Sequence, residues 1–315
     1  MYQLSGGIVM GWAMGANDAA NVFGTAVASR MVSYRVAVML AALFVLCGAL
    51  LQGSGGIETI GELTVQNAQS AMVTSLVAGG TVILMTVAKL PVSTSQAVMG
   101  ALIGMGLYTA PDQVQWSSLT KVVVCWVGTP IGAALVALML YPLLGGLLDR
   151  LCLNLVTRSI LLRSLLLVSG CYGAYALGAN NVANVTGVYS QTELMPQLGD
   201  QAGLILALVG GLSIALGVIT YSKNVMFTVG SRLVQLGTFS ALISVLAMAV
   251  TVHFYAMVGV PVSTSQAIVG AVLGIGIVKS VRTINRSICL QICFGWILTP
   301  AIAGVICYLL AWLTV

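Results

Sequence analysis

Charged side chains are scarce in this sequence. Asp, Glu, Lys and Arg together make up 6% of the 315 residues, whereas 59% are hydrophobic. A soluble domain carries about 25% charged residues. Twelve Lys and Arg with seven Asp and Glu are too few to form a polar shell around such a chain, so lipid must cover most of its surface. The composition therefore predicts a multi-pass integral membrane protein with the lipid bilayer as a partner.

The sequence gives no support for a nucleic-acid-binding protein, a metal-binding protein or an enzyme. The bases behind the formal charge of +5 are scattered in short loops between apolar runs, which argues against nucleic acid as a partner. The seven cysteines form no CxxC pair and lie mostly in apolar segments, so we interpret them as packing residues rather than metal ligands. No paired carboxylates or Ser/His arrangement stands out, and we expect neither an enzyme nor a cofactor.

Ten apolar runs approach the roughly 20 residues needed for one membrane crossing. If every run crosses, eleven of the twelve bases lie on one side, and Lys121 alone lies on the other. By the positive-inside rule the basic side is cytoplasmic. The protein is then predicted to lie in the plasma membrane with both termini extracytoplasmic. The runs are 4–28, 35–53, 68–88, 91–108, 119–145, 160–188, 203–221, 236–258, 261–278 and 288–314.

Two motifs occur twice, in the same order. Gly15–Gly24 reads GANDAANVFG, and 163 residues later Gly178–Gly187 reads GANNVANVTG. Pro91–Ala97 reads PVSTSQA and recurs unchanged 170 residues later, at Pro261–Ala267. The shared order predicts two homologous halves. We place them at residues 1–148 and 164–315, joined by a short cytoplasmic connection at 149–163.

Five crossings per half would make the second half enter the membrane from the opposite face. The predicted fold is therefore an all-α membrane protein with two inverted-topology repeats of about five membrane segments each, which is typical of transporters. Glycines around the asparagine motifs and prolines at the serine motifs predict broken or discontinuous helices at GANDAAN, GANNVAN and both PVSTSQA segments. If the PVSTSQA segments only dipped into the membrane, the repeats would be parallel instead.

Polar side chains in the middle of the first apolar run are candidate ligands. Asn17 and Asn21 share one helical face, with Asp18 three residues before Asn21. A carboxylate at that depth usually faces a cavity or a cation. We predict that Asp18 binds a coupling cation and that the two asparagines bind substrate. Amides and small residues that only pack helices together are the alternative interpretation.

The second half repeats this spacing without the acid. Asn180 and Asn184 are the matching substrate candidates, while Asn181 replaces the carboxylate. An amide oxygen at Asn181 would hold a coupling cation more weakly than a carboxylate would. Glu58 is either a further cation ligand or an exposed loop acid, and its counterpart in the second half is Phe227.

Each PVSTSQA segment has the features of a helix start, because proline preorganises the entry and a Ser or Thr can cap the first turn. Hydroxyls beside free backbone amides suit a tetrahedral oxyanion. Ordinary capping is the alternative, and it explains one copy better than two identical ones. No Lys or Arg lies in these motifs, so a co-bound cation would have to offset the oxyanion's charge. The candidate donors are Ser93, Thr94, Ser95, Ser263, Thr264 and Ser265.

The paired motifs resemble the inorganic phosphate transporter (PiT) family, which has a GANDVANA-like sequence in both halves and a PVSTS-type segment after each. The likeness covers nearly the whole chain. It implies secondary active transport of phosphate by alternating access, coupled to sodium or protons. A sulfate permease of the same fold is the alternative, an ion channel is a remote one, and a homodimer is a candidate assembly.

The resemblance also implies roles for individual residues. Glu58 matches a family glutamate, whereas Asn181 and Phe227 stand where the family usually has acids. The site residues that carry over are Asn17, Asp18, Asn21, Ser93, Thr94 and Ser95 in the first half, and Asn180, Asn184, Ser263, Thr264 and Ser265 in the second.

Overall fold

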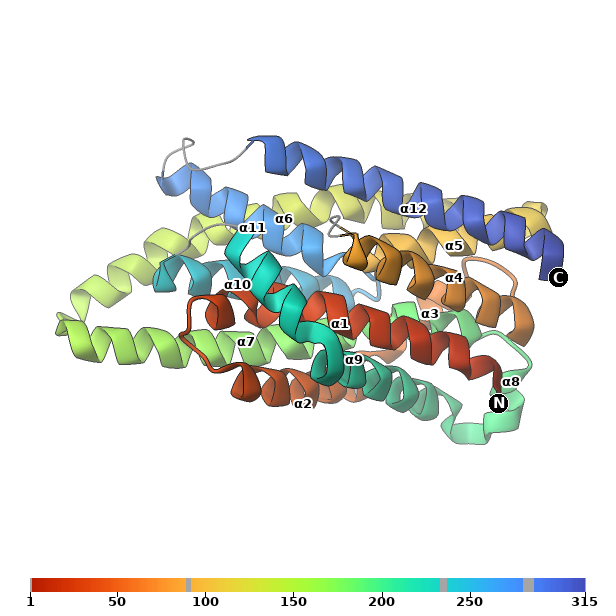
Figure 1. Ribbon diagram of the computed structural model, residues 1–315, viewed down its shortest axis with the longest axis horizontal. Helices are drawn as coiled ribbons and strands as arrows, with labels where there is room; N and C mark the ends of the chain where they lie inside the picture. The colour runs from red at the N-terminus through yellow and green to blue at the C-terminus, as the bar shows by residue number, and fades with distance from the viewer. Residues whose placement is uncertain (1, 89–91, 233–236, 280–285, 315) are drawn as a thin grey trace.

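The structure is a computed structural model that describes residues 2–88, 92–232, 237–279 and 286–314 (Figure 1). Over these residues it is built from α-helices joined by short turns and 3-10 helices. The α-helices are α1 (Ser5–Ala28), α2 (Tyr34–Gln52), α3 (Ser54–Gly61), α4 (Ala68–Val87), α5 (Thr94–Thr109), α6 (Trp116–Arg150), α7 (Leu155–Thr186), α8 (Leu194–Leu198), α9 (Ala202–Arg232), α10 (Thr238–Met257), α11 (Thr264–Lys279) and α12 (Arg286–Thr314).

Seven helical segments of the described chain are long and apolar enough to cross a membrane. The ten predicted runs all coincide with helices, but three do not meet this criterion. α5 and α11 have 16 residues each, about 24 Å at 1.5 Å per residue, against a hydrocarbon core of about 30 Å. α1 is long enough, but its asparagines, aspartate and glycines lower its hydropathy. These three helices are mostly buried in the protein rather than exposed to lipid.

Helix packing follows the same pattern in both halves. α1 packs along α9, and its counterpart α7 packs along α2, so the first helix of each half lies against the second long helix of the other. In the same way α5 packs on α12 and α11 packs on α6. Equivalent glycines make these last contacts: Gly100 lies against the backbone of Pro300, and Gly270 against that of Pro130. Each of these contacts therefore has a counterpart in which the two halves have exchanged roles, and we call this relation the pseudo-twofold exchange.

α1 and α7 run antiparallel (Figure 1). The backbone N–H of Gly7 donates to the Tyr189 hydroxyl at 3.1 Å, and that hydroxyl donates to the Gln3 carbonyl at 2.9 Å. The start of α1 thus contacts the 3-10 turn Gly187–Tyr189 that follows α7. Both chain termini lie at this end of the bundle (Figure 1).

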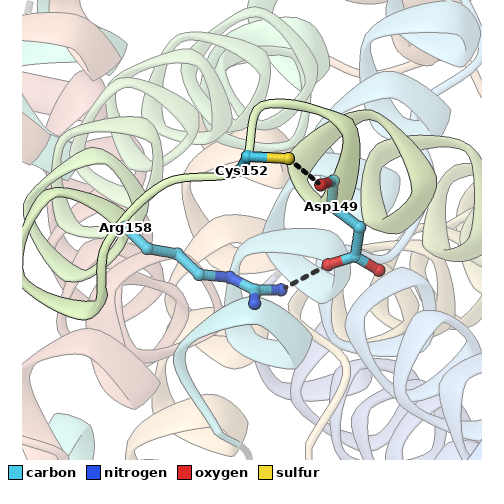
Figure 2. Close-up of polar contacts among 3 residues, drawn as sticks. All are labelled: Asp149, Cys152 and Arg158. Atoms are coloured by element: carbon cyan, nitrogen blue, oxygen red, sulfur yellow. Dashed lines mark hydrogen bonds and ion pairs between the residues drawn. The ribbon is translucent and has the colours of Figure 1, made fainter.

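The turn between the halves is short, because α6 ends at Arg150 and α7 begins at Leu155. The two helix ends are joined by an ion pair between Arg158 Nη2 and Asp149 Oδ1 at 3.0 Å (Figure 2). Cys152 in this turn has a positive φ of 47°. Both ion-pair side chains are exposed, so this contact is a weak link between the two helices.

The prediction of broken helices at the asparagine motifs is wrong. α1 continues through GANDAAN, and α7 continues through GANNVAN. The glycines serve close packing instead of unwinding: Gly15 lies against the backbone of Ile214 in α9, and Gly178 against that of Val45 in α2. Both helices keep their backbone hydrogen bonds, which satisfies the peptide groups inside the bundle.

The serine motifs, by contrast, contain helix starts. α5 begins at Thr94 and α11 at Thr264. Ser93 is in an extended conformation (φ −108°, ψ 111°) and its side chain caps α5. Pro91 lies outside the described residues.

Substituting Gly178 by Ala should destabilise the protein. The new Cβ would overlap the Val45 carbonyl, and overpacking of this kind costs about 1–3 kcal/mol. The control is Gly80→Ala on α4, where no atom lies within 4 Å of the position that the new methyl group would take and a helical alanine is favoured by up to about 1 kcal/mol. Thermal unfolding in detergent should give a lower Tm for Gly178→Ala only. Equal Tm values for the two variants would contradict the close helix contact.

Candidate functional site

The two serine motifs meet inside the protein. Ser93 Oγ donates to Ser263 Oγ at 2.9 Å, and each residue is no more than 1% exposed. Each hydroxyl also lies at the first turn of its own helix, where it accepts from the N–H of Gln96 at 3.4 Å and of Gln266 at 3.3 Å, respectively. The amino-terminal ends of α5 and α11 therefore converge on one point.

The third hydroxyl of each motif bonds to the backbone of the other motif. Ser95 Oγ donates to the Val262 carbonyl at 3.0 Å, and Ser265 Oγ donates to the Val92 carbonyl at 3.2 Å. The two turns are thus joined by a reciprocal pair of hydrogen bonds that follows the pseudo-twofold relation.

Asp18 lies at the centre of this junction and is 1% exposed. Its Oδ2 accepts from Thr94 Oγ1 at 2.9 Å, from Thr264 Oγ1 at 3.2 Å and from Asn181 Nδ2 at 2.8 Å. Its Oδ1 accepts from Asn17 Nδ2 at 2.9 Å. One carboxylate from α1 is therefore held by donors from α1, α5, α7 and α11.

The asparagines of the second half are fixed by the backbone of the serine motif. Asn180 Oδ1 accepts from the Val262 N–H at 2.8 Å, and Asn180 Nδ2 donates to the Val262 carbonyl at 2.7 Å. Asn180 Nδ2 also donates to Asn181 Oδ1 at 2.7 Å. In the first half, Asn17 instead accepts from Thr86 Oγ1 at 3.3 Å and is only partly buried.

The last asparagine of each motif contacts the serine motif of the opposite half. Asn21 Nδ2 donates to Thr264 Oγ1 at 3.2 Å, and Asn184 Nδ2 donates to Ser95 Oγ at 2.9 Å. All predicted substrate-binding residues are therefore brought into one cluster. Its members are Asn17, Asn21, Ser93, Thr94, Ser95, Asn180, Asn184, Ser263, Thr264 and Ser265, with Asp18 and Asn181 between them, and we call this set the central cluster.

The carboxylate of Asp18 is stabilised by groups that carry no formal charge. In the described part of the chain the one ion pair is that of Arg158 with Asp149 on the surface. The converging helix starts of α5 and α11 each carry a partial positive charge of about 0.5. Together with the hydroxyl and amide donors, these two helix ends stabilise the carboxylate without a basic side chain.

Four buried amide oxygens of the described residues lack a hydrogen-bond donor, those of Gln66, Gln96, Gln266 and Asn184. The last three belong to the serine and asparagine motifs, and each of these residues is no more than 3% exposed. All three are acceptors, and carbonyl oxygens are ligands that hard cations such as Na⁺ accept. The central cluster thus offers hydroxyl and amide donors for an anion alongside one free oxygen, that of Asn184, for a cation.

Glu58 does not join the central cluster. It lies on α3, which buries Ile57 and Ile60 against the end of α7, whereas the Glu58 side chain is exposed. This position agrees with the exposed-acid interpretation of Glu58 and separates it from Asp18.

Sequence reasoning missed two kinds of partner. Thr86, near the end of α4, bonds to Asn17, and no repeated motif singled it out. The backbone groups of Val92 and Val262 are also part of the cluster. A search for hydroxyl donors opposite each polar motif could have suggested the threonine, but the backbone contacts have no side-chain signature.

A bundle of membrane-spanning helices around a buried cluster of hydroxyl, amide and carboxylate groups defines a multi-pass membrane transport protein. The chain belongs to the phosphate transporter family, whose profile matches residues 14–157 and 153–307. These two matches meet at the short turn after α6, so each half of the chain corresponds to the family separately. The family consists of transporters, so the chain is not an enzyme.

Relatives from distant organisms match almost the whole chain. A "putative phosphate permease" of Methanocaldococcus jannaschii is 29% identical, over 94% of this chain and 92% of its own length. A protein of the same description from Haemophilus influenzae is 28% identical, over 93% of this chain and 91% of its own length. A solved structure of a sodium-dependent phosphate transporter has the same fold, with a TM-score of 0.86, 22% identity and 99% coverage of both chains.

Removing one hydroxyl donor from Asp18 should destabilise the protein. Thr94→Val keeps the side-chain shape but deletes a hydrogen bond to a buried carboxylate, which is worth about 1.5–3 kcal/mol. Thr94→Ser restores the donor and should recover most of the loss. The measurement is Tm in detergent, with Thr120→Val on the exposed face of α6 as the control. If Thr94→Val unfolded at the same temperature as Thr120→Val, the Thr94 contact would contribute nothing.

Proposed function

We propose that this protein is a secondary active transporter that moves inorganic phosphate across the plasma membrane by alternating access. The observation that carries this proposal is the central cluster, in which two serine motifs and two asparagine motifs from both halves surround one buried carboxylate. Membership of the phosphate transporter family supports phosphate as the substrate.

The proposed architecture consists of two inverted-topology repeats, residues 1–148 and 164–315, each with five membrane segments. The antiparallel course of α1 and α7 and the exchanged helix pairs support this arrangement. The short helices α5 and α11 would form the fourth of the five segments in each repeat, within the protein. The positive-inside rule supports a cytoplasmic turn between the repeats and extracytoplasmic termini.

The oxyanion is proposed to bind between the starts of α5 and α11. Each hydroxyl of the serine motifs has one hydrogen, which it now donates to a neighbouring oxygen. Rotating these hydroxyls toward a phosphate would exchange one oxygen acceptor for another. The asparagine Nδ2 groups supply further donors, and the free amides of the two helix starts favour an anion.

A coupling cation is proposed to bind at Asp18. A phosphate beside this carboxylate would place two negative groups in a buried site, so a cation must accompany it. Sodium is supported by the sodium-dependent transporter that shares this fold, and a proton is the alternative. Carbonyl oxygens such as that of Asn184 would complete the coordination.

Purified protein in proteoliposomes should accumulate labelled phosphate when an inward sodium gradient is imposed. Sodium and proton gradients are varied separately, and liposomes without protein are the control. Unlabelled phosphate should inhibit uptake more strongly than sulfate. Stronger inhibition by sulfate would identify a sulfate permease, and conductance without accumulation would identify a channel; either result would refute the proposal.

Asp18→Asn should reduce sodium-driven phosphate uptake at least tenfold while the protein still folds. The amide keeps the shape of the carboxylate but removes its charge, so the cation loses its anionic ligand. The matched control is Asp112→Asn on the exposed 3-10 turn before α6, which should transport normally. Sodium-driven uptake by Asp18→Asn at the wild-type rate would show that Asp18 does not couple the ion.

A further inference from the structure

Asn181 occupies the position in the second half that Asp18 occupies in the first. The two residues are 163 positions apart, the offset of the asparagine motifs. The preceding asparagine donates to each in the same way: Asn17 Nδ2 to Asp18 Oδ1 at 2.9 Å, and Asn180 Nδ2 to Asn181 Oδ1 at 2.7 Å. The two side chains are therefore equivalent under the pseudo-twofold exchange.

These equivalent side chains contact each other across the junction of the halves. Asn181 Nδ2 donates to Asp18 Oδ2 at 2.8 Å, and both residues are no more than 1% exposed. An acid at both positions would place two carboxylates in direct contact, and like charges at this distance cannot both stay ionised without a cation or proton between them. The Asn181 amide removes that requirement.

The orientation of the Asn181 amide is set by the backbone. The Val262 N–H can only donate, so it fixes Asn180 Oδ1 as its acceptor, and Asn180 Nδ2 must then face the Val262 carbonyl and Asn181 Oδ1. Asn181 Oδ1 is committed to that bond, and its Nδ2 is the group turned toward Asp18. Asn181 thus presents a donor to the carboxylate, whereas a cation ligand would have to present an oxygen.

We propose that Asn181 sets the number of coupling cations. Its Nδ2 satisfies Asp18 Oδ2 in place of a second cation, so this protein carries one sodium ion fewer per phosphate than the same chain with an acid at position 181. This inference rests on the proposed sodium-coupled transport and replaces the role of weak cation ligand expected for Asn181 from the sequence.

The first test measures sodium binding through stability, independently of transport. Tm in detergent is followed as NaCl replaces choline chloride at constant ionic strength, for wild type and Asn181→Asp. Asn181→Asp should be less stable than wild type without sodium and should gain more Tm as sodium is added. The control, Asn67→Asp, adds an acid at the cap of α4 and should follow wild type. A sodium response of Asn181→Asp equal to that of wild type, or a Tm that rises only on acidification, would overturn the proposal.

The second test counts ions directly. Uptake of ²²Na⁺ and ³²P-phosphate is measured in the same proteoliposomes, and the sodium-to-phosphate ratio should rise by one in Asn181→Asp. An unchanged ratio would overturn the proposal. If wild type moved no phosphate while Asn181→Asp still gained the stronger sodium response of Tm, the proposed function and the ion count per phosphate would fail, whereas the replacement of a cation at Asp18 by the Asn181 amide would stand.

A third variant covers the case in which Asn181→Asp does not fold. Asn181→Ala removes the donor to Asp18 without adding charge. The stability of the folded protein should then depend more strongly on a sodium ion at Asp18 than it does in wild type. The expected result is a larger rise of Tm with sodium in Asn181→Ala. A sodium response equal to that of wild type would show that the Asn181 amide does not stand in for a cation.

Discussion

A buried carboxylate surrounded by neutral donors is the constraint on which this structure depends. Desolvating an ionised carboxylate costs several kcal/mol or more unless hydrogen bonds replace the lost water. Asp18 receives those bonds from four helices, two from each half. The halves must therefore converge on Asp18, and the contact that holds them together is also the candidate binding site.

The surrounding bundle makes this convergence feasible through small residues inside and large residues outside. Between membrane helices the hydrophobic effect gives little attraction, and association depends on close packing and hydrogen bonds. Glycines such as Gly15, Gly178 and Gly100 let backbones touch. Leu143 and Met139 of α6 are exposed, as expected for side chains that face lipid. The interior thus combines close helix contacts with one polar cluster, while large apolar side chains face outward.

Much of this arrangement could be predicted from the sequence, because repeated motifs carry their own alignment. The helices and the gathering of the asparagine and serine motifs followed from apolar runs and identical PVSTSQA segments. Continuity of α1 and α7 did not, since a glycine such as Gly178 permits both unwinding and close packing. The Asn180–Val262 contact could not be predicted, because a backbone partner leaves no pattern in the sequence. The exposure of Glu58 depends on how α3 packs, which its own segment does not reveal.

The hydrogen bonds between the serine motifs also constrain how the proposed transport cycle could work. The bonds from Ser93 to Ser263 and from Ser95 to Val262 cross between the halves, so any rocking of one half must break them. A buried hydroxyl that loses its acceptor is costly, and an oxyanion with several oxygens can replace all of these acceptors at once. Hydroxyls suit this exchange better than lysine, because a fixed positive charge would remain unpaired after the anion leaves. The chemistry of the motif thus favours a substrate that is itself rich in acceptors.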